Sequence, residues 1–300
     1  MTYKEACEKG SAILEKAGVQ EAALDARLLL EHVCGTDRNF LLVHGDSVLE
    51  FEKRAAYFEL VEKRSRRLPL QQLTGVQYFM GLPFQVDENV LIPRQDTEIL
   101  AEEVLRNLHD GMRVLDMCTG SGCILISLLH YTNDCQGLGA DISSDALKVA
   151  EKNAMLLLGE NRNMQPDDQG LESEKAQEQL RIRFVESNLF EKVDGIFDIV
   201  VSNPPYIPSE EIEGLMPEVR DHEPRLALDG GDDGLLFYRR IIECCKDHLT
   251  RGGMLFLEIG YTQGEAVSRM MEQAGFLDIH VKKDYAGLDR VVFGTLSFEL

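Results

Sequence analysis

Four consecutive residues, Asn203-Pro204-Pro205-Tyr206, could hold a planar –NH₂ group for chemistry at its nitrogen. They follow a strongly apolar stretch, 196–201, which is expected to be a strand. Each proline fixes its own φ and keeps the residue before it extended, so the turn is stiff and not helical. The Asn203 side-chain oxygen and the Pro204 carbonyl can then accept two N–H bonds, beside the Tyr206 ring. A turn that merely closes the sheet is the alternative.

Methyl transfer suits such a site. An amide nitrogen is a weak nucleophile because its lone pair is delocalised. Accepting hydrogen bonds from both N–H groups raises the electron density on nitrogen and aims the lone pair, and proximity to a methyl sulfonium does much of the rest. No general base is needed first, because the proton can leave to water after transfer.

A second apolar stretch ends in small residues that could receive a nucleoside-containing cofactor. The stretch 114–117 leads into a loop that opens a helix, whose N-terminus supplies unpaired N–H groups. A dinucleotide fingerprint would need a third glycine, where this chain has Leu125. A plain strand-to-helix turn is the alternative. The loop residues are Cys118, Thr119, Gly120, Ser121 and Gly122.

Asp141 ends the next expected strand, 137–141. A carboxylate in that place can accept hydrogen bonds from ribose hydroxyls. The alternative role is the N-cap of the following helix, but Ser143 or Ser144 can cap that helix and leave Asp141 free. The loop and this carboxylate together predict a nucleoside-containing cofactor.

Composition excludes several classes of protein. A net charge of −21 argues against a phosphate-gripping surface. We interpret the one basic run, 63–67, as a solvated helix end. Seven cysteines without zinc spacing predict reduced, mostly buried thiols and no metal. No apolar run spans a bilayer and the first residues are charged, so we expect a cytoplasmic chain without membrane contact.

The elements that must position these residues form two regions and a linker. Residues 1–68 show helical spacing broken by glycines and predict a bundle of short helices. Residues 69–95 predict a hairpin linker, with extended pieces at 79–86 and 90–93 around a turn at 87–89. A helix is expected at 96–108, with Asp96 or Thr97 as its N-cap.

Residues 96–300 alternate strands and helices, which is typical of an α/β fold with a mostly parallel sheet covered on both faces. The last two strands have no helix between them, which predicts an antiparallel edge hairpin. Residues 161–179 are polar and predict a flexible insertion. The expected strands are 113–117, 137–141, 182–186, 196–201, 254–259, 278–282 and 290–296, and the expected helices are 123–130, 144–158, 235–249 and 264–274.

Motifs along nearly the whole chain resemble the peptide chain release factor glutamine N5-methyltransferase family (HemK/PrmC). The Asn-Pro-Pro-Tyr turn is shared with nucleic-acid adenine methyltransferases, but the linker and the Glu-Pro-Arg segment are more specific. These motifs are Pro69 to Gly75, Phe79 to Leu82, Val90 to Glu98, Val114 to Gly122, Asp141, Ser187 to Phe190, Asn203 to Ile207, Glu223 to Leu228 with Gly230-Gly231, and Leu257 to Gly260.

The resemblance implies a Rossmann-like, seven-stranded methyltransferase domain that uses S-adenosylmethionine and releases S-adenosylhomocysteine. It implies a helical domain that helps recognise the protein substrate, and as target the glutamine of the Gly-Gly-Gln motif in release factors. By position, residues 118–122 would line the methionine portion of the cofactor and Asp141 would hold its ribose. Asn188 and Leu189 would border the adenine, and residues 203–206 would hold the glutamine amide.

Three residues depart from the family's usual pattern. Cys118 replaces a glycine, so its backbone is expected to avoid a positive φ unless the loop differs locally. Asn188 replaces an aspartate and is expected to keep a hydrogen bond to adenine. Leu189 lacks the aromatic ring of some members.

Two other acceptors remain open from the sequence. A glutamine of a ribosomal protein would need almost the same motifs. A nucleic-acid adenine methyltransferase is disfavoured by the acidic composition and by the lack of an evident nucleic-acid-reading domain, so we expect no direct sequence-specific binding of nucleic acid.

Overall fold

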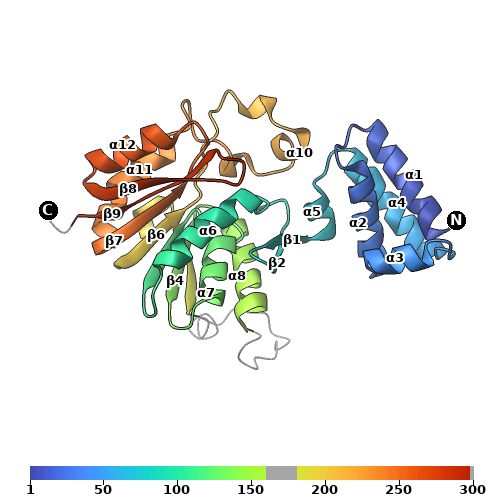
Figure 1. Cartoon of the computed structure of the whole chain (residues 1–300), viewed down its shortest axis with the longest axis horizontal. Coiled ribbons are helices and arrows are strands. Elements are labelled where there is room, and N and C mark those ends of the chain that lie inside the picture. The colour runs from blue at the N-terminus through green and yellow to red at the C-terminus, as the bar shows by residue number, and fades with distance from the viewer. Residues whose placement is uncertain (160–180, 298–300) are drawn as a thin grey trace. The chain divides into compact units, whose positions relative to one another are not determined.

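The computed structural model describes residues 1–159 and 181–297 (Figure 1). The chain forms two compact units: unit 1 comprises residues 1–76 and 215–222, and unit 2 comprises residues 77–214 and 223–300. Unit 1 therefore ends inside the predicted linker, and it takes in a short segment from the middle of the predicted methyltransferase domain. The predicted insertion at 161–179 lies outside the described residues.

Unit 1 consists of short helices around one apolar core, as the glycine-punctuated pattern predicts. Thr2 caps the first helix and exchanges hydrogen bonds with Glu5 in a capping box. Tyr57 and Leu29 are among the fully buried core side chains. The helices are α1 (Tyr3–Lys16), α2 (Ala22–Cys34), α3 (Arg38–His44), α4 (Phe51–Ser65), α5 (Leu70–Thr74) and α10 (Pro217–Arg220).

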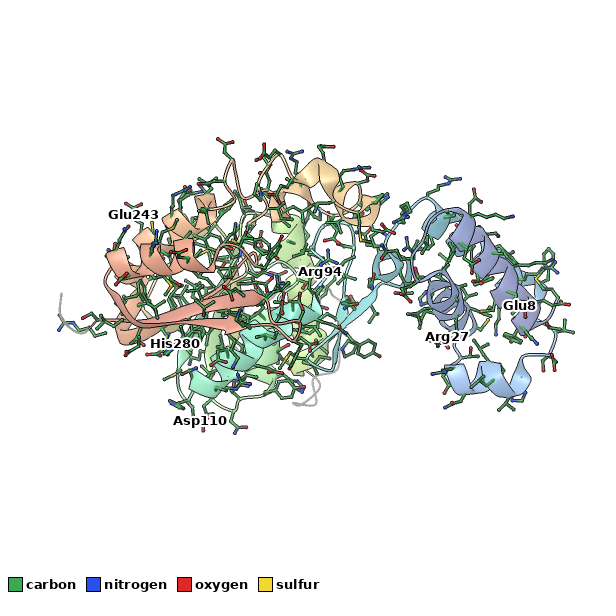
Figure 2. The ribbon with its side chains drawn as sticks, turned by 45° about the horizontal axis from the view of Figure 1, so that its top comes forward. Glu8, Arg27, Arg94, Asp110, Glu243 and His280 are labelled. Atoms are coloured by element: carbon green, nitrogen blue, oxygen red, sulfur yellow. The ribbon has the colours of Figure 1, made fainter. Side chains whose placement is uncertain are left out.

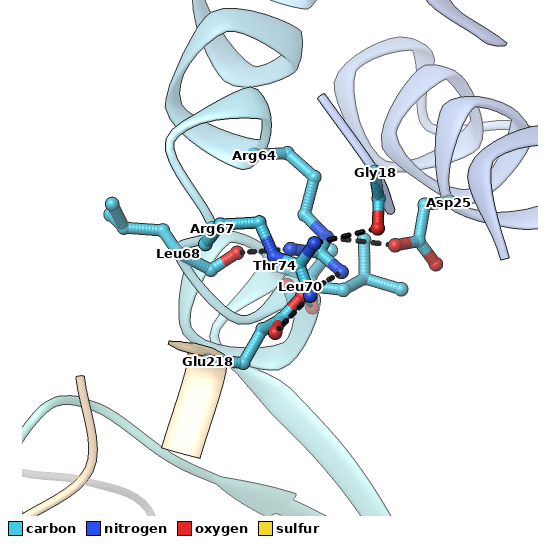
Figure 3. A network of polar contacts seen from close by, with 8 residues as sticks. All are labelled: Gly18, Asp25, Arg64, Arg67, Leu68, Leu70, Thr74 and Glu218. Atoms are coloured by element: carbon cyan, nitrogen blue, oxygen red, sulfur yellow. Dashed lines mark hydrogen bonds and ion pairs between the residues drawn. The ribbon is translucent and has the colours of Figure 1, made fainter. Parts of the chain in front are cut away.

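The basic run at the end of α4 is only partly a solvated helix end, which corrects the interpretation from sequence. Arg64 is 6% exposed and donates to Asp25 Oδ2 at 2.7 Å and to Glu218 Oε1 at 2.9 Å. Arg67 donates to Glu218 Oε2 and to the carbonyl of Gly18, both at 2.6 Å (Figure 3). These carboxylates lie far from the run in sequence, so charge patterning alone does not reveal them.

The linker hairpin exists, but it turns earlier than predicted. Its strands are β1 (Val76–Phe79) and β2 (Leu82–Gln85), and the turn lies at Met80 and Gly81. Both turn residues have positive φ, 50° and 76°, as a tight two-residue hairpin requires. The predicted turn at 87–89 is a local one, in which Asp87 accepts from the backbone N–H of Asn89 at 2.9 Å.

Unit 2 contains the predicted seven-stranded sheet, with strand order β5-β4-β3-β6-β7-β9-β8. The pairs from β5 to β7 are parallel, and β9 is antiparallel to both β7 and β8, which confirms the predicted edge hairpin. The strands are β3 (Arg113–Met117), β4 (Gln136–Asp141), β5 (Ile182–Glu186), β6 (Phe197–Ser202), β7 (Leu249–Glu258), β8 (Phe276–Lys283) and β9 (Asp289–Leu296).

Helices cover both faces of this sheet (Figure 1). One face packs against α6 (Gln95–Asn107), α7 (Cys123–His130) and α8 (Ser144–Gly159), and the other packs against α11 (Leu236–Cys245) and α12 (Gly264–Gln273). Unit 2 also contains short 3₁₀ helices, which are η2 (Leu189–Lys192), η3 (Ile212–Gly214), η4 (Arg225–Ala227) and η5 (Lys246–His248). The helix predicted at 235–249 is shorter in the structure. It ends at Cys245, and Leu249 already pairs with Phe197 in the sheet.

The N-cap predicted for α6 is wrong. Arg94 occupies that position with extended backbone and no side-chain cap. The two predicted caps are engaged elsewhere, since the Thr97 hydroxyl accepts from Asn203 and Asp96 pairs with Arg290. A polar residue near a helix start is therefore free to serve the neighbouring turn.

The seven cysteines are free thiols, four of them buried. Among the described residues, no helix combines the length and the apolar character needed to cross a membrane.

Candidate functional site

A pocket opens in unit 2 where β3, β4 and β6 end, the edge at which open α/β sheets bind ligands. Most predicted segments contribute to it. The predicted residues on its wall are Cys118, Gly120, Asp141, Asn188, Leu189, Asn203 and Pro205. The predicted residues that are not on its wall are Thr119, Ser121, Gly122, Pro204 and Tyr206.

Buried side chains under the pocket hold the loop that follows β3. Thr119 donates its hydroxyl to Asp116 Oδ2 at 2.6 Å, and Asp116 is fully buried. Burial raises the pKa of Asp116 to about 7, against the lowering effect of the Thr119 hydrogen bond. A Cβ on Gly122 would stand 2.7 Å from the Ile126 side chain. Asn153 Nδ2 also donates to the Ser121 carbonyl at 3.0 Å. Thr119, Ser121 and Gly122 therefore fix the shape of the loop beneath the pocket surface.

Cys118 corrects an expectation, because its backbone has φ 62°, in the left-handed region. That conformation costs an L-residue other than glycine about 1–2 kcal/mol. The preceding residue is fixed, since the Ser202 hydroxyl donates to the Met117 carbonyl at 2.6 Å. The loop thus holds Cys118 in a left-handed backbone conformation that glycine usually adopts.

The strain at Cys118 can be measured by substitution. Cys118→Gly is expected to raise the free energy of unfolding by up to about 1 kcal/mol, because glycine adopts positive φ freely. Cys118→Val is expected to lower it by at least about 1–2 kcal/mol, because a β-branched residue tolerates this conformation worst. Urea unfolding of the two variants tests the account, and a glycine variant less stable than the valine variant would contradict it.

Asp141 is bound to the backbone rather than free of it, which refines the prediction. Its Oδ2 accepts from the N–H of Gly120 and its Oδ1 from the N–H of Ser143, both at 2.9 Å. Ser143 is the cap of α8, as expected, and accepts from Ala146 at 3.2 Å. Burial raises the pKa of Asp141, while those backbone hydrogen bonds lower it. The two backbone hydrogen bonds fix the orientation of the Asp141 carboxylate, and each of its oxygens can still accept a further hydrogen bond.

The lining suits a nucleoside-containing group. Gly120 has φ 55°, and an added Cβ would meet no atom within 4 Å, so its backbone is open to the pocket. Leu189, Ala146 and Phe237 supply apolar surface for a flat ring. Asp141 supplies the acceptor that ribose hydroxyls require.

Asn188 uses both ends of its amide within the protein. Its Nδ2 donates to Glu191 Oε1 at 2.6 Å, and its Oδ1 accepts from Arg240 at 3.1 Å. Arg240 also lines the pocket, and sequence reasoning missed it. The arginine lies in α11, whose pattern reads as an ordinary amphipathic helix, so no local signal marks it.

The Asn203–Tyr206 turn packs tightly against a later segment. Gly230 donates its N–H to the Ile207 carbonyl at 2.8 Å, and a Cβ on Gly230 would lie 2.7 Å from Tyr206 Cα. Gln263 donates to the Tyr206 carbonyl at 3.0 Å. Gly230 thus allows the backbone approach that holds the turn in place.

Gly230→Ala is expected to lower kcat by at least about tenfold, because its Cβ would push the backbone that carries Tyr206. Gly214→Ala is the matched control, since a Cβ there would meet no atom within 4 Å. Steady-state kinetics of both variants test this, and equal kcat values would contradict a positioning effect of the close approach.

Sequence reasoning also missed the linker and the Glu-Pro-Arg segment as parts of the pocket wall. Arg94, labelled in Figure 2, precedes α6 and donates to the buried Glu223 at 2.6 Å. This ion pair joins the linker motif to the Glu-Pro-Arg motif within unit 2. The wall residues that were missed in these segments are Asn89, Val90, Leu91, Pro224, Leu226 and Ala227. The charged residues Arg94 and Glu223, one in each motif, are the sequence signal for this contact.

The chain is similar in sequence to known protein families and to individual relatives. Residues 5–75 match the model of the PrmC N-terminal domain, and residues 136–257 match that of the Eco57I restriction-modification methylase. A release factor glutamine methyltransferase from Geobacter sulfurreducens is 41% identical over 95% of this chain and 93% of its own length. One from Clostridium acetobutylicum is 39% identical over 97% of this chain and 98% of its own length.

A solved structure supports the fold alone. The crystal structure of a methyltransferase from Pyrococcus furiosus matches with a TM-score of 0.50 at 15% identity, covering 79% of this chain and 99% of that one. The two chains therefore share a fold over this part of the chain.

Proposed function

The chain belongs to the release factor glutamine methyltransferase family, and from that premise we propose that it methylates the side-chain amide nitrogen (N5) of a release factor glutamine. The observation that carries the proposal is the orientation of Asn203. Its Nδ2 donates to the Thr97 hydroxyl at 3.3 Å, so its Oδ1 remains to accept from an acceptor –NH₂.

S-adenosylmethionine supplies the electrophilic methyl group when bound. In this proposal Cys118 and Gly120 border its methionine portion, and Asp141 accepts from its ribose hydroxyls. Leu189 forms apolar surface beside the adenine, and Asn188 borders it while held by Glu191 and Arg240. Thr119, Ser121 and Gly122 keep the loop in shape.

The turn acts on the acceptor nitrogen. Asn203 Oδ1 and the Pro204 carbonyl accept the two N–H bonds, which raises electron density on the nitrogen and fixes its lone pair. Pro205 keeps Pro204 extended, and Tyr206 closes the far end of the turn. The proton leaves to water after transfer, because the methylated nitrogen is acidic.

The finer assignment is the glutamine of the Gly-Gly-Gln motif of release factors, in the cytoplasm. The helical domain predicted from the sequence, residues 1–68, contributes to recognition of the release factor. We propose no sequence-specific contact with nucleic acid, and the net charge of −21 supports this.

An acceptor assay tests the function. The enzyme is incubated with methyl-labelled S-adenosylmethionine and, separately, with intact release factor, ribosomal proteins, DNA and RNA. We expect label in the release factor alone. Label in a ribosomal protein or in a nucleic acid, with none in the release factor, would overturn the proposal.

A further inference from the structure

Two buried polar residues lie behind the Asn203–Tyr206 turn. Thr97, in α6, is 2% exposed, and Glu258, at the end of β7, is 1% exposed. In the sheet Ser202 pairs with Leu257, so Asn203 and Glu258 leave neighbouring strands at the same level. A carboxylate buried this deeply needs partners that stabilise its charge.

Those partners are the two ends of the turn. The Tyr206 hydroxyl donates to Glu258 Oε1 at 3.3 Å. Asn203 Nδ2 donates to Thr97 Oγ1 at 3.3 Å, and the Thr97 hydroxyl lowers the pKa of the neighbouring Glu258 carboxyl. Glu258 Oε2 is buried with no hydrogen-bond partner among the described residues, so it is an acceptor available to the Thr97 hydroxyl proton. Both polar side chains of the turn therefore lead to one carboxylate.

The chemistry of these groups sets the direction of each hydrogen bond. An ionised carboxylate only accepts, so the single hydroxyl proton of Thr97 points to Glu258. The Thr97 oxygen then presents a lone pair to Asn203, which must offer its –NH₂. A protonated or amidated residue 258 could instead donate to Thr97, whose proton could turn to Asn203 Oδ1. Asn203 would then present –NH₂ outward, which cannot accept from an acceptor amide.

We propose that Glu258 is a positioning residue that acts through Thr97 to keep the Asn203 oxygen facing the acceptor nitrogen. The proposal rests on the proposed function, because it assumes that Asn203 accepts from the substrate amide. Glu258 also holds the Tyr206 hydroxyl at the other end of the turn, so one carboxylate orients both ends.

The surroundings of Glu258 make this arrangement sensitive to pH. Burial raises the pKa of Glu258 to about 7, against the lowering effects of Thr97, Arg290 and Tyr206, while Asp96 adds to the rise. The titratable and charged groups facing it are Asp96 from α6, Cys123 from α7, Tyr238 from α11, Arg290 from β9 with its partner Asp284, and Tyr206. Above about pH 7 the carboxylate form directs the relay, and below it the proton weakens that direction.

The test compares Glu258→Gln, Thr97→Val and Thr97→Ser with the wild-type enzyme. For each we would measure kcat and KM for intact release factor from pH 5.5 to 9 (a range set about the Glu258 pKa of about 7), and S-adenosylhomocysteine affinity by calorimetry. We expect Glu258→Gln and Thr97→Val to lower kcat by about 10–100-fold with cofactor affinity within about twofold. Thr97→Ser keeps the hydroxyl and is expected to stay within about threefold of wild type.

The following outcomes decide whether Glu258 acts through Thr97. Loss of the acidic limb of the wild-type pH profile in Glu258→Gln supports the relay, as does a double variant no slower than either single one. Wild-type kcat in Glu258→Gln, or a serine variant as slow as the valine variant, overturns it. If wild type itself methylates no glutamine in the release factor, the proposed function fails, and if it does so while Glu258→Gln is unimpaired, only the relay fails.

Discussion

Replacing Asn203 with alanine is expected to lower kcat for methylation of a release factor by at least about 100-fold, a loss typical of removing one aligned hydrogen-bonding group from an active site. Binding of S-adenosylhomocysteine is expected to stay within about twofold. The cofactor portion of the pocket is built mainly on Cys118, Gly120 and Asp141, whose hydrogen bonds do not involve Asn203.

The control for this variant is Asn133→Ala, the same substitution on an exposed loop away from the pocket. Steady-state kinetics and calorimetry of both variants give the answer. If Asn203→Ala keeps turnover within about tenfold of wild type, or loses cofactor binding as strongly as it loses turnover, then Asn203 does not have the acceptor role assigned to it.

Replacing Arg64 with alanine is expected to lower the free energy of unfolding by about 3–5 kcal/mol, the usual cost of removing one partner from a buried ion pair. Asp25 is 5% exposed and Glu218 is 8% exposed, so both would lose a buried cationic partner. The loss is large because two buried carboxylates share the same guanidinium, and both would be left without it (Figure 3).

Arg66→Ala is the matched control, because Arg66 lies two residues away and is 70% exposed, with Glu62 as its partner. A change within about 0.5 kcal/mol is expected there, as for other exposed pairs. Urea unfolding of the full-length protein compares the two variants. Equal stabilities would mean that the buried network contributes no more than a surface pair.

The same network predicts a dependence on pH. Burial raises the pKa of Glu218, but hydrogen bonds from Arg67 and Arg64 outweigh it and lower the pKa below its usual value. A carboxyl group with a lowered pKa stabilises the fold above its unfolded pKa, and this contribution disappears as pH falls through the folded pKa. The stability difference between wild type and Arg64→Ala should therefore shrink in acid.

The sequence predicted the sheet well because each strand has its own apolar run. The seven strands, the parallel core and the edge hairpin follow from local patterns, and so does the pocket edge where Asp141 and Asn203 end their strands. The turn of the linker was misplaced, because Met80-Gly81 lacks the Asn-Gly or Asp-Gly signal of tight hairpins.

Contacts between distant segments could not be predicted. Thr97 near the start of α6 looked like a helix cap, yet its hydroxyl bonds to Asn203 more than a hundred residues later. Arg64 looked solvated, since neither Asp25 nor Glu218 is near it in sequence. Cys118 looked unable to follow a glycine path, but the fixed loop imposes that path on it. In each case tertiary packing overrides a correct local preference.

The most direct test of the central claim is fragment mass spectrometry of intact release factor after incubation with the wild-type enzyme and S-adenosylmethionine. We expect one added methyl group, located on the side-chain amide of the glutamine in the Gly-Gly-Gln motif, and at least about 100-fold less of it with Asn203→Ala in the same time. A methyl group on any other residue, or the same glutamine methylated equally by Asn203→Ala, would contradict it.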